Sequence, residues 1–245
     1  MSVVVGAHID DLGRPVAEWM STGRILMTLK RAFRWNVFLV NVVRKQIGWL
    51  EAVSAALEHL ERRLGAMKGG WSVDKVPDGQ KVTVCMFGDG ELPNVTSYAT
   101  VGLSGIPLQV HEGDREVLVE LMVCSYSMSN TRESGYGPWP GILEHVAHRS
   151  VQEGMAVLRG DFIPLPGPIA PGSEMVALYA MPPVYYPDDF SSFPLKGGQR
   201  AAIVWLIPIG DRELNRCIEV GWSDFEAELV ARNPDVLDLH RGQMV

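Results

Sequence analysis

Two short groups of residues have types and spacing that could support chemistry. The segment Gly102-Leu103-Ser104-Gly105 approaches the Gly-x-Ser-x-Gly turn that exposes a nucleophilic serine, but it lacks the residue that separates the serine from the second glycine. His145 and His148 are three residues apart, so a helix would place both on one face, close enough to share a metal ion. No Cys, Asp or Glu cluster completes that pair in the sequence, and we interpret both histidines as structural.

The sequence therefore offers no positive support for catalysis. We predict no catalytic residues, no metal site and no cofactor. One enzymatic alternative stays open, a hydrolase that assembles Ser104 with one of the histidines, because catalytic triads form from residues that are distant in sequence.

Composition and charge restrict the class of protein further. The 245 residues are 47% hydrophobic and 21% charged, which is typical of a globular protein. A net charge of -7 argues against nucleic acid as the main partner, because phosphate binding needs clustered Lys and Arg. Cys85, Cys124 and Cys217 are far apart and odd in number, which fits a reducing compartment. The apolar run Asn36–Val43 is shorter than the ~20 residues that span a bilayer, and we find no secretory signal, so we expect a cytoplasmic protein without integral membrane association.

The first part of the chain differs from the rest in charge. Residues 21–50 contain no acidic residue, and apolar residues are interleaved with six basic ones. Such a segment could form a basic amphipathic helix that touches a membrane surface or a partner, or it could be an accessory extension, which we favour. We therefore divide the chain into an N-terminal extension over residues 1–48, helical or poorly ordered, and a domain over residues 49–245. The six basic residues are Arg24, Lys30, Arg31, Arg34, Arg44 and Lys45.

Hydrophobic spacing predicts the elements of this domain. Leu50, Val53, Leu57, Leu60 and Leu64 are 3, 4, 3 and 4 residues apart, so they form one stripe of a helix that Gly65 should end. A second helix should begin at Trp139-Pro140. Asp211 should cap a third helix. The sequence Ser223–Glu226 should cap a fourth, which ends before Pro234. We expect strands over residues 81–87, 95–101, 106–110, 116–124, 174–180 and 201–209.

The order of these elements indicates the fold class. In the clearest strand, Val117, Val119, Leu121 and Val123 should face one side, and Leu118, Glu120 and Met122 the other. Strands and helices follow one another without a strict β-α-β rhythm. This favours an α+β fold, a mixed and mainly antiparallel sheet packed with helices, which we place on one side of it.

Six short motifs, in order along roughly the last four fifths of the chain, resemble those of the suppressor of fused family. Each is weak alone, but independent local signals that agree carry weight. The resemblance implies the fold of the N-terminal domain of that family. The motifs are Tyr98-Ala99-Thr100-Val101-Gly102-Leu103-Ser104, Val119-Glu120-Leu121, Trp139-Pro140 with Leu143, Gly160-Asp161, Val204-Trp205-Leu206-Ile207-Pro208-Ile209 with Glu213-Leu214, and Asp238-Leu239-His240-Arg241-Gly242.

The family also implies a function in protein binding. Its animal members bind a short transcription-factor peptide as an added β-strand clamped between two domains, a mode in which main-chain hydrogen bonds supply affinity. By motif match, Tyr98 and Glu120 correspond to positions near that peptide site. The Tyr98 hydroxyl could then reach a ligand. For Glu120 we favour a different role, an internal salt bridge or the capping of backbone amides, because burying an unpaired charge is costly.

Two departures from the animal pattern put the same peptide ligand in doubt. The likeness covers only the first domain, so we expect the second half of the clamp to be missing. Gly105-Ile106-Pro107-Leu108 also replaces the acidic, Tyr-containing segment that follows the Gly-Leu-Ser of the family. Bacterial single-domain relatives are regarded as candidate immunity proteins that neutralise a toxin domain. We therefore expect a non-catalytic protein-binding domain of this kind; the alternatives are the hydrolase and a membrane-peripheral adaptor.

Overall fold

The computed structural model describes residues 7–9, 15–17, 48–73, 81–111, 113–127 and 137–245. It divides the chain into two compact units, Met1–Gln46 and Ile47–Val245. In the first unit, β1 (Ala7–Ile9) pairs antiparallel with β2 (Pro15–Ala17). Nearly all of the basic segment over residues 21–50 lies outside the described residues, so its helix and the extension over residues 1–48 stay predictions.

The second unit is built around a nine-stranded sheet whose main path runs β3-β4-β5-β7-β11-β9-β8. Among its described strands, β7 and β11 form a parallel pair and the other neighbours are antiparallel, which confirms a mixed, mainly antiparallel sheet. The strands are β3 (Met67–Ser72), β4 (Thr83–Phe87), β5 (Val95–Val101), β6 (Leu108–Gln109), β7 (Glu116–Tyr126), β8 (Phe162–Pro164), β9 (Met175–Met181), β10 (Ser192–Pro194) and β11 (Arg200–Gly210).

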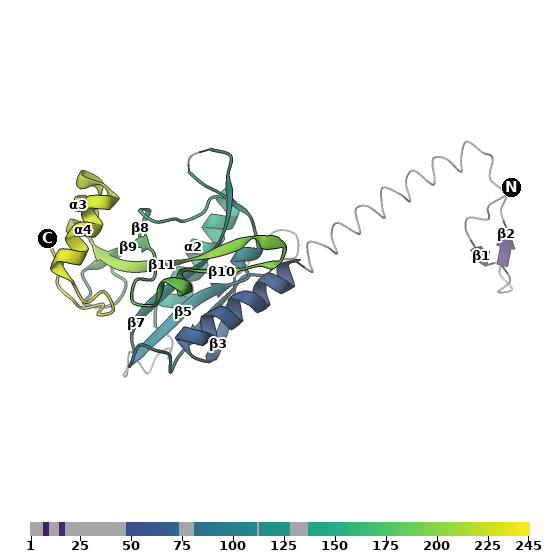
Figure 1. The fold of residues 1–245 in the computed structure, drawn as a ribbon, viewed down its shortest axis with the longest axis horizontal. Coiled ribbons are helices and arrows are strands. Elements are labelled where there is room, and N and C mark those ends of the chain that lie inside the picture. Colours follow the sequence, from purple (N-terminus) through teal and green to yellow (C-terminus); the bar gives the residue numbers. More distant parts are fainter. Residues whose placement is uncertain (1–6, 10–14, 18–47, 74–80, 112, 128–136) are drawn as a thin grey trace. The chain divides into compact units, whose positions relative to one another are not determined.

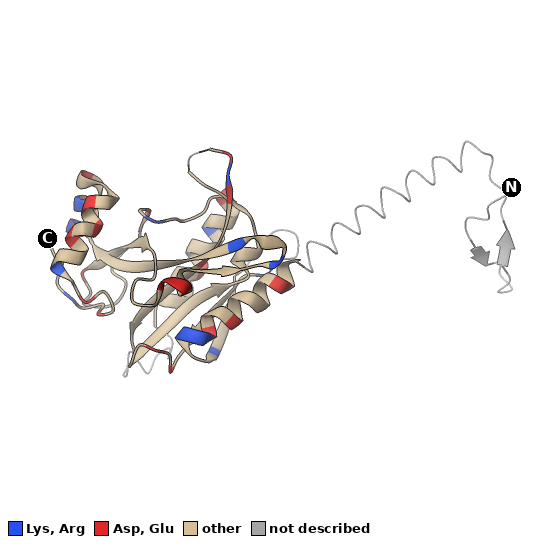
Figure 2. Ribbon diagram, in the orientation of Figure 1, with Lys and Arg blue, Asp and Glu red and all other residues tan. Residues whose placement is uncertain are grey.

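Along the chain, helices come before, between and after these strands. Residues 48–64 are helical, followed in the chain by α2 (Trp139–Glu153), α3 (Asp211–Val220) and α4 (Trp222–Arg232). Short 3-10 turns are η2 (Leu103–Gly105), η3 (Asp188–Ser191) and η4 (Lys196–Gly198). Among the described residues, no helix combines the length and the apolar character that crossing a membrane requires. Charged residues lie mainly on the helices and connecting segments, and the strands carry few (Figure 2).

The strands are apolar on both faces, so the sheet has a hydrophobic core on each side. Alternate residues of β7 separate as predicted: Val119 and Leu121 pack with α2, whereas Met122 and Cys124 pack in the core that contains Leu60 of the helix over residues 48–64. Our placement of the helices on one side was therefore wrong: α2 and the helix over residues 48–64 lie on opposite faces (Figure 1).

The helix over residues 48–64 follows the predicted stripe only in part. Leu60 and Leu64 are buried, but Leu50 is 57% exposed. Ala52 and Ala56, which lie outside the predicted stripe, are buried, and their small side chains allow the helix to lie close to its neighbours. Gly65 ends the helix at φ +82°, where a Cβ would lie 2.1 Å from the Gly88 carbonyl oxygen.

Both predicted N-caps near the C-terminus are wrong. Gly210 precedes α3, and Asp211 is the first helical residue; the Gly210 amide instead donates to the Glu213 carboxylate at 2.8 Å. Helix α4 starts at Trp222, so Ser223 lies inside its first turn and makes no cap. Its end at Arg232, before Pro234, is confirmed.

Candidate functional site

Glu120 lies on β7 with its side chain completely buried, facing the segment that joins β5 to η2. Its Oε1 accepts hydrogen bonds from the amides of Gly102 at 2.9 Å and Ser104 at 3.0 Å, and from the Ser104 hydroxyl at 2.7 Å. Its Oε2 accepts from the Thr100 hydroxyl at 2.6 Å. Of the two roles that we favoured for Glu120, a salt bridge or the capping of backbone amides, the structure confirms the second. The motifs that contain Gly102-Leu103-Ser104 and Val119-Glu120-Leu121 therefore meet in one cluster.

Local backbone geometry explains why this cluster forms. Gly102 has φ +102°, and a Cβ there would lie 2.7 Å from the Lys81 carbonyl oxygen, so a larger residue would not fit the turn that aims its amides at Glu120. Burial raises the pKa of Glu120 to about 7, although the hydrogen bonds from Thr100 and Ser104 act in the opposite direction. The carboxyl group fixes the η2 turn from inside the protein and does not reach the surface.

The residues considered for catalysis or metal binding do not form a catalytic or metal site within the described part of the chain. Ser104 is 1% exposed, and its hydroxyl is bonded to Glu120, which is a structural arrangement and not that of an exposed nucleophile. His145 and His148 do lie on α2, with His145 exposed. Within the described part of the chain, no group of three or more His, Cys, Asp or Glu side chains is placed to hold a metal ion.

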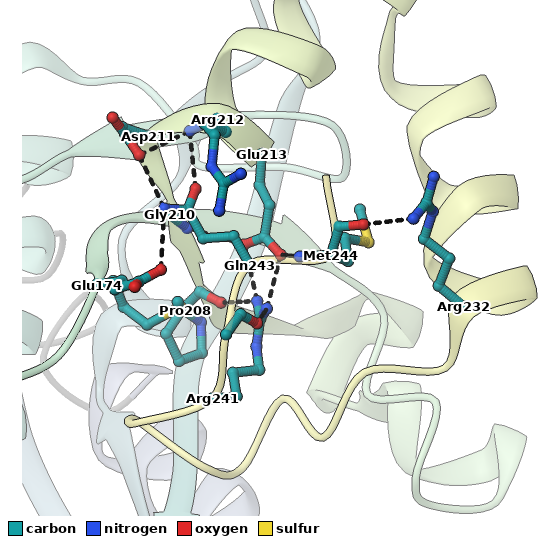
Figure 3. Close-up of polar contacts among 12 residues, drawn as sticks. Glu174, Pro208, Gly210, Asp211, Arg212, Glu213, Arg232, Arg241, Gln243 and Met244 are labelled. Atoms are coloured by element: carbon teal, nitrogen blue, oxygen red, sulfur yellow. Dashed lines mark hydrogen bonds and ion pairs between the residues drawn. The ribbon is translucent and has the colours of Figure 1, made fainter.

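Glu213 is a second buried carboxylate, at the start of α3, and it is paired with a cation. The Arg241 guanidinium donates to both Glu213 oxygens at 2.6 and 2.9 Å, and also to the Pro208 carbonyl at 3.0 Å. The backbone amides of Gly210 and Met244 complete the set at 2.8 Å each. Figure 3 shows Glu213 between Arg241 and these amides. This network ties the C-terminal segment to β11 and α3.

The remaining motifs also have structural roles. The Trp139 Nε1 donates to the Ser125 hydroxyl at 2.9 Å, which links the start of α2 to the end of β7. Gly160 has φ +92° and allows the Trp222 ring to approach closely. Asp161 accepts from the Leu158 amide at 2.8 Å and faces His111 Nε2 at 3.1 Å. The quoted motifs thus specify contacts within the fold and do not by themselves mark a binding surface.

A cavity of about 580 Å³ crosses one end of the sheet, and we call it the groove. Its walls come from β3, the β4–β5 turn, β5, the end of β7 and the start of α2, including Lys68, Tyr98, Tyr126 and Trp139. Tyr98 is buried, with its ring centroid 6.3 Å from that of Trp71. The structure thus places Tyr98 in the wall of the groove. The volume of the groove is within the range of ligand-binding cavities.

Two exposed tyrosines, Tyr126 in the groove wall and Tyr185, are close enough to interact electrostatically, and the exposed Val184 directly precedes Tyr185; we call these three residues the tyrosine patch. The exposed fractions of Tyr126, Val184 and Tyr185 are 43%, 58% and 39%. The Tyr126 hydroxyl donates to Asp235 at 2.9 Å, which raises the Tyr126 pKa. Tyr185 packs on Trp205 with ring centroids 5.0 Å apart, so its ring is held in place. Exposed, fixed tyrosines are typical of the energetic centre of a protein interface.

Two carboxylates lie near the tyrosine patch. Asp235 and Asp238 both act on the Tyr126 hydroxyl, and neither has a salt bridge within the described residues. Asp89 lines the groove and is paired with Lys68 at 2.9 Å. Sequence reasoning missed this surface. The signal that could have found it is Tyr185 in a short loop bounded by prolines, which restrict the backbone conformation.

Comparisons with known proteins agree with this fold. No curated protein matches the sequence. The solved structure of a suppressor of fused homolog from Neisseria gonorrhoeae FA 1090 has a TM-score of 0.61 at 15% identity, over 80% of this chain and 98% of that one. A chain of a Sufu–Fu complex has a TM-score of 0.51 at 14% identity, over 73% of this chain and 84% of that one. At such identities these likenesses show the fold alone.

The family follows from a separate comparison. The model of the suppressor of fused protein family matches residues 78–242, more than half of the chain, and the matched segment contains all six quoted motifs. The chain belongs to the suppressor of fused family.

Proposed function

We propose that this protein is a non-catalytic, cytoplasmic protein-binding domain that acts as an immunity protein and neutralises a bacterial toxin domain. Family membership supports the binding role, and one structural neighbour is a chain of a complex between Sufu and another protein. The observation that carries the proposal is the tyrosine patch beside the groove. It combines rigid aromatic anchors with a concave surface, the combination that gives an interface its strongest contacts.

The charge of this surface defines the kind of partner that it fits. Asp235 and Asp238 act on Tyr126 and have no salt bridge among the described residues, so in a chain of net charge -7 they favour a basic partner surface. Charge complementarity of this kind accelerates association and disfavours acidic proteins. A toxin domain that cleaves nucleic acid has such a basic surface, because it must bind phosphates.

We assign indirect roles in binding to Tyr98 and Glu120. Tyr98 forms part of the groove wall and so contributes to its shape. Glu120 is completely buried, and its contribution is to hold the η2 turn through Gly102 and Ser104. Substituting either residue should weaken binding only as far as it disturbs the fold.

The test compares two valines that are both exposed, one in the tyrosine patch and one outside it. Val184→Lys places a positive charge where a basic partner would dock, whereas Val230→Lys makes the same change on α4, where Val230 is 80% exposed. We expect affinity capture with the native protein to yield one stoichiometric partner. Val184→Lys should weaken its binding by about a hundredfold and Val230→Lys by less than about threefold.

Two further results separate binding from immunity. Co-expression of the captured partner with the native protein, but not with Val184→Lys, should restore growth if the partner is a toxin. A partner that binds through the tyrosine patch without being toxic would refute the immunity role and leave protein binding intact. Equal weakening by both lysine variants would refute the assignment of the surface.

A further inference from the structure

A second cavity, of about 390 Å³, carries three arginines. It lies between the second half of the helix over residues 48–64, η3 and the β10–β11 hairpin, and its lining includes Arg62, Arg63 and Arg200 with a single carboxylate, Asp189. We call it the arginine pocket. Three guanidinium groups against one carboxylate are unusual in a chain with 22 basic and 29 acidic residues.

Arg200 is held in a fixed orientation in the wall of this pocket. Its Nε and Nη2 donate to the Ser192 hydroxyl at 3.2 and 2.8 Å, and Nη2 also donates to the Ser192 carbonyl at 3.0 Å. Within the described part of the chain, its Nη1 has no hydrogen-bond partner. Because Ser192 holds one edge of the Arg200 guanidinium, the remaining N–H groups can donate to a ligand. The side chain is already ordered, so it loses little conformational entropy when a ligand binds.

The other two arginines differ in how strongly they are engaged. Arg63 donates to Glu91 at 2.6 Å and to Asp189 at 3.3 Å, so it is already partly neutralised. Arg62 is 64% exposed and meets Glu58 only at 3.6 Å, a surface pair that contributes little. Arg62 can therefore turn toward a bound anion at small cost, and it faces the same cavity as Arg200.

His59 also lines the arginine pocket, and its ring stacks on two phenylalanines. Its ring centroid lies 5.2 Å from that of Phe190 and 5.1 Å from that of Phe193. The Nε2 is 2.9 Å from the Phe190 carbonyl oxygen, and because a carbonyl only accepts, Nε2 carries the proton. Burial lowers the His59 pKa, and the charges of Arg62 and Arg200 act in the same direction. An anion bound in the pocket would offset the charges of Arg62 and Arg200 and so raise the His59 pKa.

We propose that the arginine pocket binds the phosphate group of a small phosphate monoester, a role separate from the protein-binding surface. Arg62 and Arg200 provide the forked donors that match phosphate oxygens, and Phe190 and Pro194 provide an apolar wall for the organic part. A cavity of about 390 Å³ exceeds what a phosphate ion alone needs and is typical of small-molecule sites.

Calorimetric titration of the full chain tests the proposal with glycerol 3-phosphate, inorganic phosphate and glutamate as probes. We expect glycerol 3-phosphate to bind tightest, and Arg62→Gln/Arg200→Gln to weaken it by at least about tenfold. The double variant Lys81→Gln/Arg115→Gln is the matched control, since it removes two positive charges from exposed residues that do not line the pocket. It should leave the affinity within about twofold.

The His59 imidazole gives a readout that a loss of folding would not imitate. In an NMR titration, glycerol 3-phosphate should raise the His59 pKa in the native protein and leave it unchanged in Arg62→Gln/Arg200→Gln. If inorganic phosphate binds as tightly as glycerol 3-phosphate, the ligand is not specifically an ester. If glutamate binds as tightly as glycerol 3-phosphate, the pocket is not specific for phosphate. Binding weaker than about 10 mM for all three probes, or an equal loss in the control variant, would overturn the site.

Discussion

Among the described residues, Glu120 and Glu213 are buried, and their negative charges are accommodated in opposite ways. Glu213 faces the Arg241 guanidinium, so a full positive charge offsets its own. Glu120 has no cation among its four donors, which are two backbone amides and two hydroxyl groups. Both carboxyl groups are excluded from solvent and both join segments that are distant in sequence.

The two arrangements should respond differently to substitution and to pH. A charge pair holds its geometry only as long as both partners are ionised, and removing one leaves a buried charge without compensation. A carboxyl group held by neutral donors can take up a proton and keep most of its hydrogen bonds, since a protonated carboxyl still accepts. The Glu213–Arg241 pair should therefore be the less tolerant region to substitution, and Glu120 the more responsive to pH.

The largest effect should follow from breaking the charged pair. Arg241→Met leaves Glu213 buried without a cation and should cost about 4 kcal/mol in the free energy of unfolding, measured by urea denaturation. Glu213→Gln/Arg241→Met removes both charges and should recover at least about 1 kcal/mol of that loss. A single variant as stable as the native protein would show that the pair contributes nothing and that the comparison is wrong.

A smaller loss should follow at Glu120, with a marked dependence on the substitution. Glu120→Ala leaves two amides and two hydroxyls without an acceptor in the core and should cost about 3 kcal/mol. Glu120→Gln retains one oxygen for the three donors on Oε1, and its amide group can donate to Thr100, so its cost should be about 1 kcal/mol. Chemical denaturation of both variants measures the difference. Equal losses would indicate that the negative charge, and not the hydrogen bonds, holds the η2 turn.

Sequence reasoning succeeded where the signal is local. The bounds of β5 were predicted correctly, the two faces of β7 follow from alternation, and Pro140 marks the start of α2. Backbone capping by Glu120 was also anticipated, because a charged residue between apolar neighbours on a buried strand must find donors. The cytoplasmic location, the toxin partner and the extension over residues 1–48 stay predictions.

What sequence reasoning missed depends on tertiary placement. Glu213 and Arg241 are 28 residues apart, and neither carries a local sign that it will meet the other. The tyrosine patch joins Tyr126 from β7 to Tyr185 from a loop, and the arginine pocket joins Arg62 to Arg200. The placement of helices on both faces was missed because apolar runs in β9 and β11 do not reveal which helix covers which side.

The last effect is the pH dependence that Glu120 should confer. A carboxyl group whose pKa rises from 4.5 to about 7 on folding binds its proton more tightly in the folded chain. Its contribution to stability is therefore complete below pH 4.5 and is lost as the pH rises through about 7. From this group alone, the protein should be about 2 kcal/mol less stable at pH 7 than at pH 5.

Glu120→Gln isolates this contribution, because every other titrating group is common to both proteins. The difference in unfolding free energy between the native protein and Glu120→Gln, measured by urea denaturation at several pH values, should shift in favour of the variant between pH 5 and 7. Glu213→Gln/Arg241→Met provides the contrast, since it removes both charges of the other pair, leaves Glu120 and its four donors in place and should keep the native slope. If the difference does not change with pH, Glu120 is ionised throughout this range, and its four neutral donors stabilise a buried charge as effectively as the Arg241 guanidinium does for Glu213.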